Sequence, residues 1–121
     1  MSTATASKEN YLKTILRIER ERGYVRASEI AEYMKVTRPS VSTAVHQLEQ
    51  QEYILIHSDH SISLTPTGLK LAETVLDRYE TFFRFFISLG VPGDIASVDA
   101  GRIEHAISDD TFMLFKKTVA I

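Results

Sequence analysis

The sequence contains no cysteine. Without cysteine the chain can form neither disulfides nor thiolate metal sites, and we expect it in a reducing cytoplasm. No apolar run approaches the roughly 20 residues of a membrane span. The N-terminal MSTATASKEN also lacks the apolar segment of a signal peptide. The sequence therefore predicts no membrane contact.

Enzyme motifs are missing as well. There is no His-Glu-x-x-His pattern, no phosphate-binding loop and no cysteine nucleophile. A hydrolase would have to depend on a single Glu-His pair at residues 104–105, which is a poor catalytic set. We therefore do not expect an enzyme.

Neither sign of charge is in large excess, since 14 Lys and Arg face 16 Asp and Glu for a net charge of −2. Nonspecific DNA binding depends on cations that neutralise phosphates. A DNA-binding protein with this balance must gather its cations on one face, and a dimer would double the patch. The candidates for such a patch are Lys8, Arg26, Lys35 and Arg38.

Residues 26–64 predict two short helices joined by a tight turn and followed by a β-hairpin. We expect Ser28 to cap the first helix and Thr37 to cap the second, with a proline in the first turn of the second. Residues 53–57 and 61–64 have the alternating or β-branched pattern of strands, separated by a turn-forming Ser-Asp-His. This order of elements is typical of a winged helix.

The second helix of this pair has a small, uncharged polar face opposite its apolar one. Such residues near a helix N-terminus suit insertion into the DNA major groove, whereas the alternative is a solvated face on an ordinary helical hairpin. The residues expected to face base edges are Thr37, Pro39, Ser40, Thr43 and His46. Those expected to hold phosphates are Arg38 and Ser42, with His57 and His60 on the wing.

Helical patterns flank this stretch on both sides. We expect Ser7 to cap the first helix, and Thr65 followed by proline to start a long one. The helices predicted outside residues 26–64 are 8–22, 66–90, 92–107 and one from about 109 to 118. The fold class is thus mostly α, with a winged helix-turn-helix domain in residues 1–70 and an all-helical dimerisation domain in residues 71–121.

The second half of the long helix is apolar on nearly all sides. Such a helix must be buried on more than one side, and apolar patches of this size are unusual on monomers. We therefore expect a homodimer with a twofold axis through this region. The predicted interface residues are Phe82, Phe85, Phe86, Ile103 and Ile107.

Five segments together carry a resemblance to a known family: ENYLKTIL at 9–16, VRASEIAEYMKV at 25–36, RPSVSTAVHQLEQQEYI at 38–54, LTPTGLKLA at 64–72 and RIEHAISDD at 102–110. The chain resembles the iron- and manganese-dependent repressors typified by the diphtheria toxin repressor and the manganese transport regulator. The resemblance implies a homodimer, a winged-helix DNA-binding domain, a helical dimerisation domain and a divalent metal that favours operator binding. It is closest to the short form without a third domain.

The positions that hold the metal in this family are largely altered. In chain order they correspond to Asn10, Lys13, Tyr79, Gly101, Glu104 and His105. Only the last two keep a ligand, while Mn²⁺ and Fe²⁺ prefer several carboxylate and imidazole donors. We therefore expect no cofactor, unless Mn²⁺ or Fe²⁺ binds a rearranged site. That site would draw on Asn10, Glu80, Asp99, Glu104 and His105.

Lys13 stands where the family has an acidic ligand. This inversion of charge suggests that Lys13 and Glu104 form a direct ion pair in place of the metal, with His105 or Asn10 adding a hydrogen bond. In the alternative, Lys13 points to solvent as long lysines usually do, and His105 is a hydrogen-bonded core histidine.

Three functions fit these observations. The first is a dimeric regulator of transcription that binds a palindromic site on double-stranded DNA, with metal control lost or remodelled. The second is a fully manganese- or iron-responsive repressor that uses a rearranged site. The third is a winged-helix module for protein contacts without DNA, which the balanced charge permits.

Overall fold

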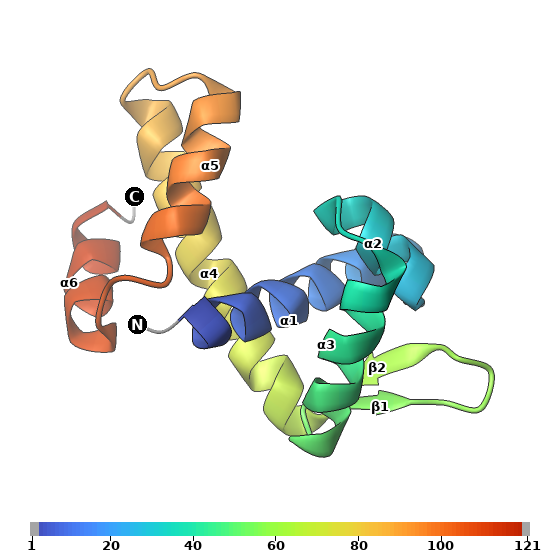
Figure 1. The fold of residues 1–121 in the computed structure, drawn as a ribbon. Helices are drawn as coiled ribbons and strands as arrows, with labels where there is room; N and C mark the ends of the chain where they lie inside the picture. Colours follow the sequence, from blue (N-terminus) through green and yellow to red (C-terminus); the bar gives the residue numbers. More distant parts are fainter. Residues whose placement is uncertain (1–2, 120–121) are drawn as a thin grey trace. The chain divides into compact units, whose positions relative to one another are not determined.

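The computed structural model describes residues 3–119 and confirms the mostly α fold (Figure 1). The chain divides between Glu73 and Thr74 into two compact units. No helix in the described part is long and apolar enough to cross a membrane. The elements are α1 (Thr3–Arg22), α2 (Ala27–Met34), α3 (Arg38–Gln50), β1 (Ile54–Ile56), β2 (Ile62–Leu64), α4 (Pro66–Ser88), α5 (Gly93–Ile103) and α6 (Asp109–Val119).

Helix α1 supplies much of the core of the N-terminal unit. Its apolar residues lie three and four positions apart, and α2, α3 and the hairpin cover them. The helix begins at Thr3, so the predicted cap at Ser7 is wrong. Alanines at positions 4 and 6 favour helix strongly enough to extend it past the serine. The core residues with at most 1% exposure are Leu12, Ile15, Leu16, Ile18, Val25, Ile30, Val41, Ile54 and Ala72.

The caps of the helix pair differ from each other. Arg26, rather than Ser28, precedes α2, and its backbone N–H donates to Glu29 Oε1 at 3.2 Å. The prediction for Ser28 is therefore wrong, because the carboxylate of Glu29 serves the helix start from inside the first turn. The cap of α3 is confirmed, since Thr37 Oγ1 accepts a hydrogen bond from the backbone N–H of Ser40 at 3.3 Å.

The wing is a short antiparallel hairpin. Ile54 pairs with Leu64, and Ile56 pairs with Ile62. Ile54 and Ile62 are buried, and the backbone N–H of Ile62 also donates to Val25 O at 2.8 Å. The two strands are thus bonded to each other, and β2 is also bonded to the segment between α1 and α2.

The wing returns to α4 through a close backbone approach. The backbone N–H of Thr65 donates to Tyr53 O at 3.0 Å, and its hydroxyl donates to Glu52 O at 2.7 Å. The same hydroxyl oxygen accepts the N–H of Gly68 at 3.1 Å, which caps α4 as predicted. A Cβ at Gly68 would lie 1.9 Å from Tyr53 O, so only glycine fits.

The C-terminal unit packs α5 and α6 against the second half of α4. Phe82 is 2% exposed, and its ring centroid lies 4.9 Å from that of Phe115 and 5.8 Å from that of Phe112. Phe82 is therefore covered within its own chain and has little surface left to contribute to the predicted subunit interface. The apolar pattern of α4 alone predicted that a partner subunit buries this residue. In the structure, aromatic residues of α6, distant in sequence, bury it instead.

Helix α5 is shorter than predicted, since it ends at Ile103 and not at residue 107. The guanidinium of Arg78, on α4, donates to Glu104 O at 3.2 Å and to Ile107 O at 2.6 Å, and it contacts the carboxylate of Asp109. A cation that gathers these oxygens holds the chain in a turn between α5 and α6.

Glycine substitutions test the approach of Tyr53 to α4. We expect Gly68→Ala to lower the free energy of unfolding by about 1–3 kcal/mol, because the backbone must move to admit the methyl group. The matched variant Gly101→Ala lies in α5 with nothing within 4 Å of its Cβ. It should be neutral or stabilising by up to about 1 kcal/mol. Urea denaturation measures both, and equal stabilities for the two variants would contradict the close approach.

Candidate nucleic-acid interface

The residues predicted to contact DNA are all exposed. Most lie at the start of α3, and the hairpin of the wing extends from the same unit (Figure 1). The structure gathers Thr37, Arg38, Pro39, Ser40, Ser42, Thr43 and His46 on α3 and its cap, whereas His57 follows β1 and His60 lies in the turn of the wing.

The hydroxyls on α3 have defined roles. Thr37 Oγ1 donates to Ser40 Oγ at 2.9 Å, which leaves the hydrogen of Ser40 for an outside acceptor. Thr43 Oγ1 donates to Pro39 O at 3.1 Å, so its hydrogen is already used. Thr43 therefore presents lone pairs and a methyl group, and Ser40 presents a donor.

His46 is held by its own helix. Its Nδ1 lies 2.6 Å from Ser42 O. A backbone carbonyl only accepts, so Nδ1 must carry a hydrogen, and in the neutral ring Nε2 is then an acceptor. An acceptor at this position complements the exocyclic amino group of adenine or cytosine in the major groove.

The wing turn carries an anion. Asp59 Oδ1 accepts the backbone N–H of Ser61 at 2.9 Å and its hydroxyl at 2.6 Å, and these bonds lower the pKa of Asp59 below its ordinary value. Nearby, His57 Nε2 lies 2.8 Å from Ser63 Oγ. The ionised carboxylate offsets the positive charge that a protonated wing histidine would bring to a phosphate.

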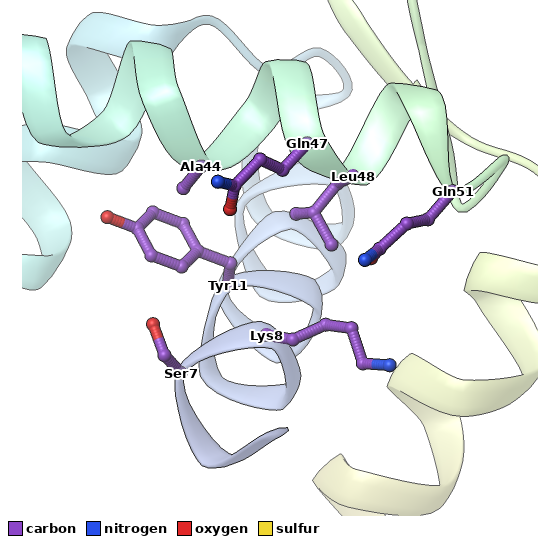
Figure 2. Close-up of a pocket in the computed structure, with 7 residues that line it drawn as sticks. All are labelled: Ser7, Lys8, Tyr11, Ala44, Gln47, Leu48 and Gln51. Atoms are coloured by element: carbon purple, nitrogen blue, oxygen red, sulfur yellow. The ribbon is translucent and has the colours of Figure 1, made fainter. Parts of the chain in front are cut away.

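Behind α3, a cleft of about 300 Å³ separates it from α1 (Figure 2). Tyr11 and Lys8 from α1, Gln47 from α3 and Gln51, which caps the end of α3, line this space. Burial raises the pKa of Tyr11. The Lys8 ammonium lies 4.8 Å from the ring centroid of Tyr53 and 3.4 Å from its hydroxyl. Lys8 is thus partly engaged within the unit.

At four of the family's metal positions the side chain either contacts another protein group or is absent. The hydroxyl of Tyr79 lies 2.8 Å from Ser97 Oγ, and Gly101 has no side chain to offer. Glu104 Oε1 contacts His105 Nε2 at 3.1 Å, and both residues are buried. Within residues 3–119, no three His, Asp or Glu side chains lie grouped so that they could hold a metal ion.

The other two metal positions, Asn10 and Lys13, lie on α1 in the N-terminal unit. Glu104 and His105 belong to the C-terminal unit. The ion pair between Lys13 and Glu104 stays a prediction.

Two family models match the chain. The description of the first is "Iron dependent repressor, N-terminal DNA binding domain", and it matches residues 3–61. The description of the second is "Iron dependent repressor, metal binding and dimerisation domain", and it matches residues 65–119. Together they span nearly all of the described chain.

Curated relatives and solved structures agree with these matches. The chain is 34% identical over 104 residues to the "HTH-type transcriptional regulator MntR" of Bacillus pumilus, covering 86% of this chain and 72% of the relative. The corresponding protein of Geobacillus kaustophilus gives the same identity and covers 74% of its length. The structure of the manganese regulator SloR has a TM-score of 0.82 at 27% identity, covering 93% of this chain and 53% of that one. The chain thus spans about half the length of the solved structure.

Proposed function

This chain belongs to the iron-dependent repressor family, and on that premise we propose that it is a dimeric, sequence-specific DNA-binding regulator of transcription that acts in the cytoplasm. The observation that carries the proposal is the exposed, uncharged polar face at the start of α3, within a winged-helix unit. We assign DNA binding to residues 1–70 and dimerisation to residues 71–121. A palindromic operator follows from a twofold dimer.

We propose that α3 reads base edges through Thr37, Pro39, Ser40, Thr43 and His46. The hydrogen of Ser40 suits a base acceptor, and the methyl group of Thr43 suits the methyl group of thymine. Arg38 and Ser42 would hold phosphates, with His57 and His60 on the wing near the backbone. The anionic Asp59 restricts the wing's share of this task.

Base readout and phosphate contact are separable by mutation. We expect Ser40→Ala and Thr43→Ala to weaken binding to the preferred duplex by about 1–3 kcal/mol while leaving binding to a scrambled duplex almost unchanged. Arg38→Gln should weaken binding to both duplexes and reduce its dependence on salt.

The preferred duplex is obtained by selection from a random pool, and fluorescence anisotropy measures the binding. Gln50→Ala, an exposed change at the far end of α3, serves as the control. If both duplexes bind the Ser40 and Thr43 variants as they bind the parent, α3 is not the reader. No salt-dependent binding to any duplex would favour a protein-contact module instead.

We further propose that metal control in this chain is lost or remodelled. The residues at the family's ligand positions do not fit Mn²⁺ or Fe²⁺, because Lys13 is cationic, Gly101 has no donor and the Tyr79 hydroxyl is bonded to Ser97. The similar solved structure of SloR is titled as that of a manganese regulator, so a fully metal-responsive repressor with a rearranged site is the second candidate.

Removal of metal distinguishes these two candidates. We expect the affinity of the parent for its preferred duplex to be the same with EDTA as with added Mn²⁺. Lys13→Glu restores a carboxylate at a family ligand position and should make binding respond to Mn²⁺. Lys117→Glu adds the same charge at an exposed site on α6 and is the control. Binding that disappears with EDTA in the parent would reject the proposal in favour of a metal-responsive repressor.

For the homodimer, we propose an interface that includes Phe85, Phe86, Ile103 and Ile107. All four are partly exposed in the single chain, unlike Phe82. The family match to a dimerisation domain over residues 65–119 supports this assignment.

A charge on Phe86 tests the interface. We expect Phe86→Glu to give a monomer in sedimentation velocity, because a carboxylate would have to be buried without a partner. Phe86 also contacts Phe82, with ring centroids 6.2 Å apart, so the circular dichroism spectrum must show that the variant remains folded. Lys117→Glu is again the control. A folded Phe86→Glu protein that is still dimeric would place the interface elsewhere.

A further inference from the structure

A groove of about 620 Å³ lies in the C-terminal unit between α4 and the end of α6. No residue of α3 and none of the family's metal positions is among its lining residues. The helical repeat of α4 directs residues three and four apart toward it. The lining residues are Thr81, Arg84, Phe85 and Ser88 on α4, with Lys116, Thr118 and Val119 on α6.

The charges of this groove have one sign. Arg84 and Lys116 are both cationic, and none of the lining residues is acidic. Lys116 Nζ is 2.7 Å from a carboxylate oxygen of Asp77, which lies outside the lining. The guanidinium of Arg84 is exposed and has no ion pair or hydrogen bond within the described residues. Five N–H donors at the rim are thus available to an anion.

The hydroxyl groups of the groove are not equivalent. Ser88 Oγ donates to Phe85 O at 2.6 Å, and Thr118 Oγ1 donates to Leu114 O at 3.0 Å. Thr81 is only 5% exposed, yet its Oγ1 has no hydrogen-bond partner among residues 3–119. A buried hydroxyl without a partner costs free energy. The Thr81 hydroxyl oxygen is itself buried, so an acceptor that enters the groove reaches its hydrogen only when neighbouring side chains move aside.

Apolar surface adjoins these polar groups. The ring of Phe85 lines the groove and meets Phe115 edge-on, with centroids 5.2 Å apart. Val119 adds a second apolar side chain. The volume falls in the range of small-molecule sites, which combine an apolar lining with a few placed polar groups.

We propose that this groove binds a small amphiphilic carboxylate. The carboxylate takes the Arg84 guanidinium and the Thr81 hydroxyl as donors, with Lys116 adding positive charge, and the tail lies along Phe85 and Val119. The binding of this molecule does not depend on the proposed function. Its role does rest on the proposed function: the bound carboxylate would act as an effector of DNA binding, in a chain whose metal positions do not fit a metal.

The probe is octanoate, with octanol as a matched ligand that lacks the charge. Calorimetry on the full chain, without DNA, should show one saturable octanoate site per chain and octanol binding at least tenfold weaker, because the charge-assisted bonds are lost. Absence of saturable octanoate binding, or equal binding of octanol, would overturn the proposal.

Two variants examine the polar donors. Arg84→Gln should weaken octanoate binding about tenfold or more, while Arg102→Gln, an exposed change on α5 outside the groove, should leave it unchanged. Thr81→Val removes the unpartnered hydroxyl at constant shape. It should raise the thermal midpoint yet weaken octanoate binding. A raised thermal midpoint with unchanged affinity for octanoate would show that the Thr81 hydroxyl does not contact the ligand, and would overturn its proposed role.

Phe85 is also among the proposed interface residues, so a second copy of the chain could cover the groove. Octanoate binding confined to the monomeric Phe86→Glu variant would show such cover and reject the site in the dimer. Binding of octanoate and binding of DNA are measured separately. A failure of either leaves the other result standing, and a change in DNA affinity with octanoate is expected only if both hold.

Discussion

The winged-helix unit depends on the contact between Tyr53 and the start of α4. The Tyr53 carbonyl accepts the N–H of Thr65 at 3.0 Å, while the N–H of Tyr53 donates to Leu48 O at the end of α3, also at 3.0 Å. One peptide segment is therefore bonded to both α3 and the residue that caps α4. The wing lies between these two fixed points, so backbone hydrogen bonds at both of its ends help to set its position next to α3. The absence of a side chain at Gly68 is the condition for this approach.

Arg78 has the corresponding role in the C-terminal unit. It is 8% exposed, and its guanidinium carbon lies 5.3 Å from the ring centroid of Phe112. A buried cation is tolerated only where hydrogen-bond acceptors surround it. The carbonyls of Glu104 and Ile107 supply them. The carbonyl groups of the turn between α5 and α6 thus accept hydrogen bonds from a residue of α4. Next to this turn, Glu104 Oε1 and His105 Nε2 lie 3.1 Å apart.

Local signals predicted the elements whose causes are local. The caps at Thr37 and Thr65 and the hairpin follow from residues within a few positions of each other, and the structure has them. The errors have two kinds of cause. The cap of α2 was assigned to Ser28 although its neighbour Glu29 accepts the N–H of Arg26, which is a choice between two local signals. The end of α5 is set by Arg78, which is 26 residues from Glu104.

The burial of Phe82 also depends on residues distant in sequence, because only the folded chain shows that α6 covers it. The exposure of the α3 face was predictable from helical period alone. The tautomer of His46 was not, since it depends on the carbonyl of Ser42 one turn earlier.

Packing and metal binding make separable demands on this fold. The apolar positions, the glycine at residue 68 and the buried arginine are required to assemble the units, whereas a metal ligand is required only by the metal. Gly101 illustrates the difference: a Cβ there would meet nothing within 4 Å, so neither crowding nor backbone geometry requires glycine. A Cβ could therefore be added at this position without a clash. Packing therefore does not explain why this position carries no donor. The contacts of Tyr53, Gly68 and Arg78 do not involve the exposed face of α3, so the fold can keep this face whichever residues stand at the metal positions.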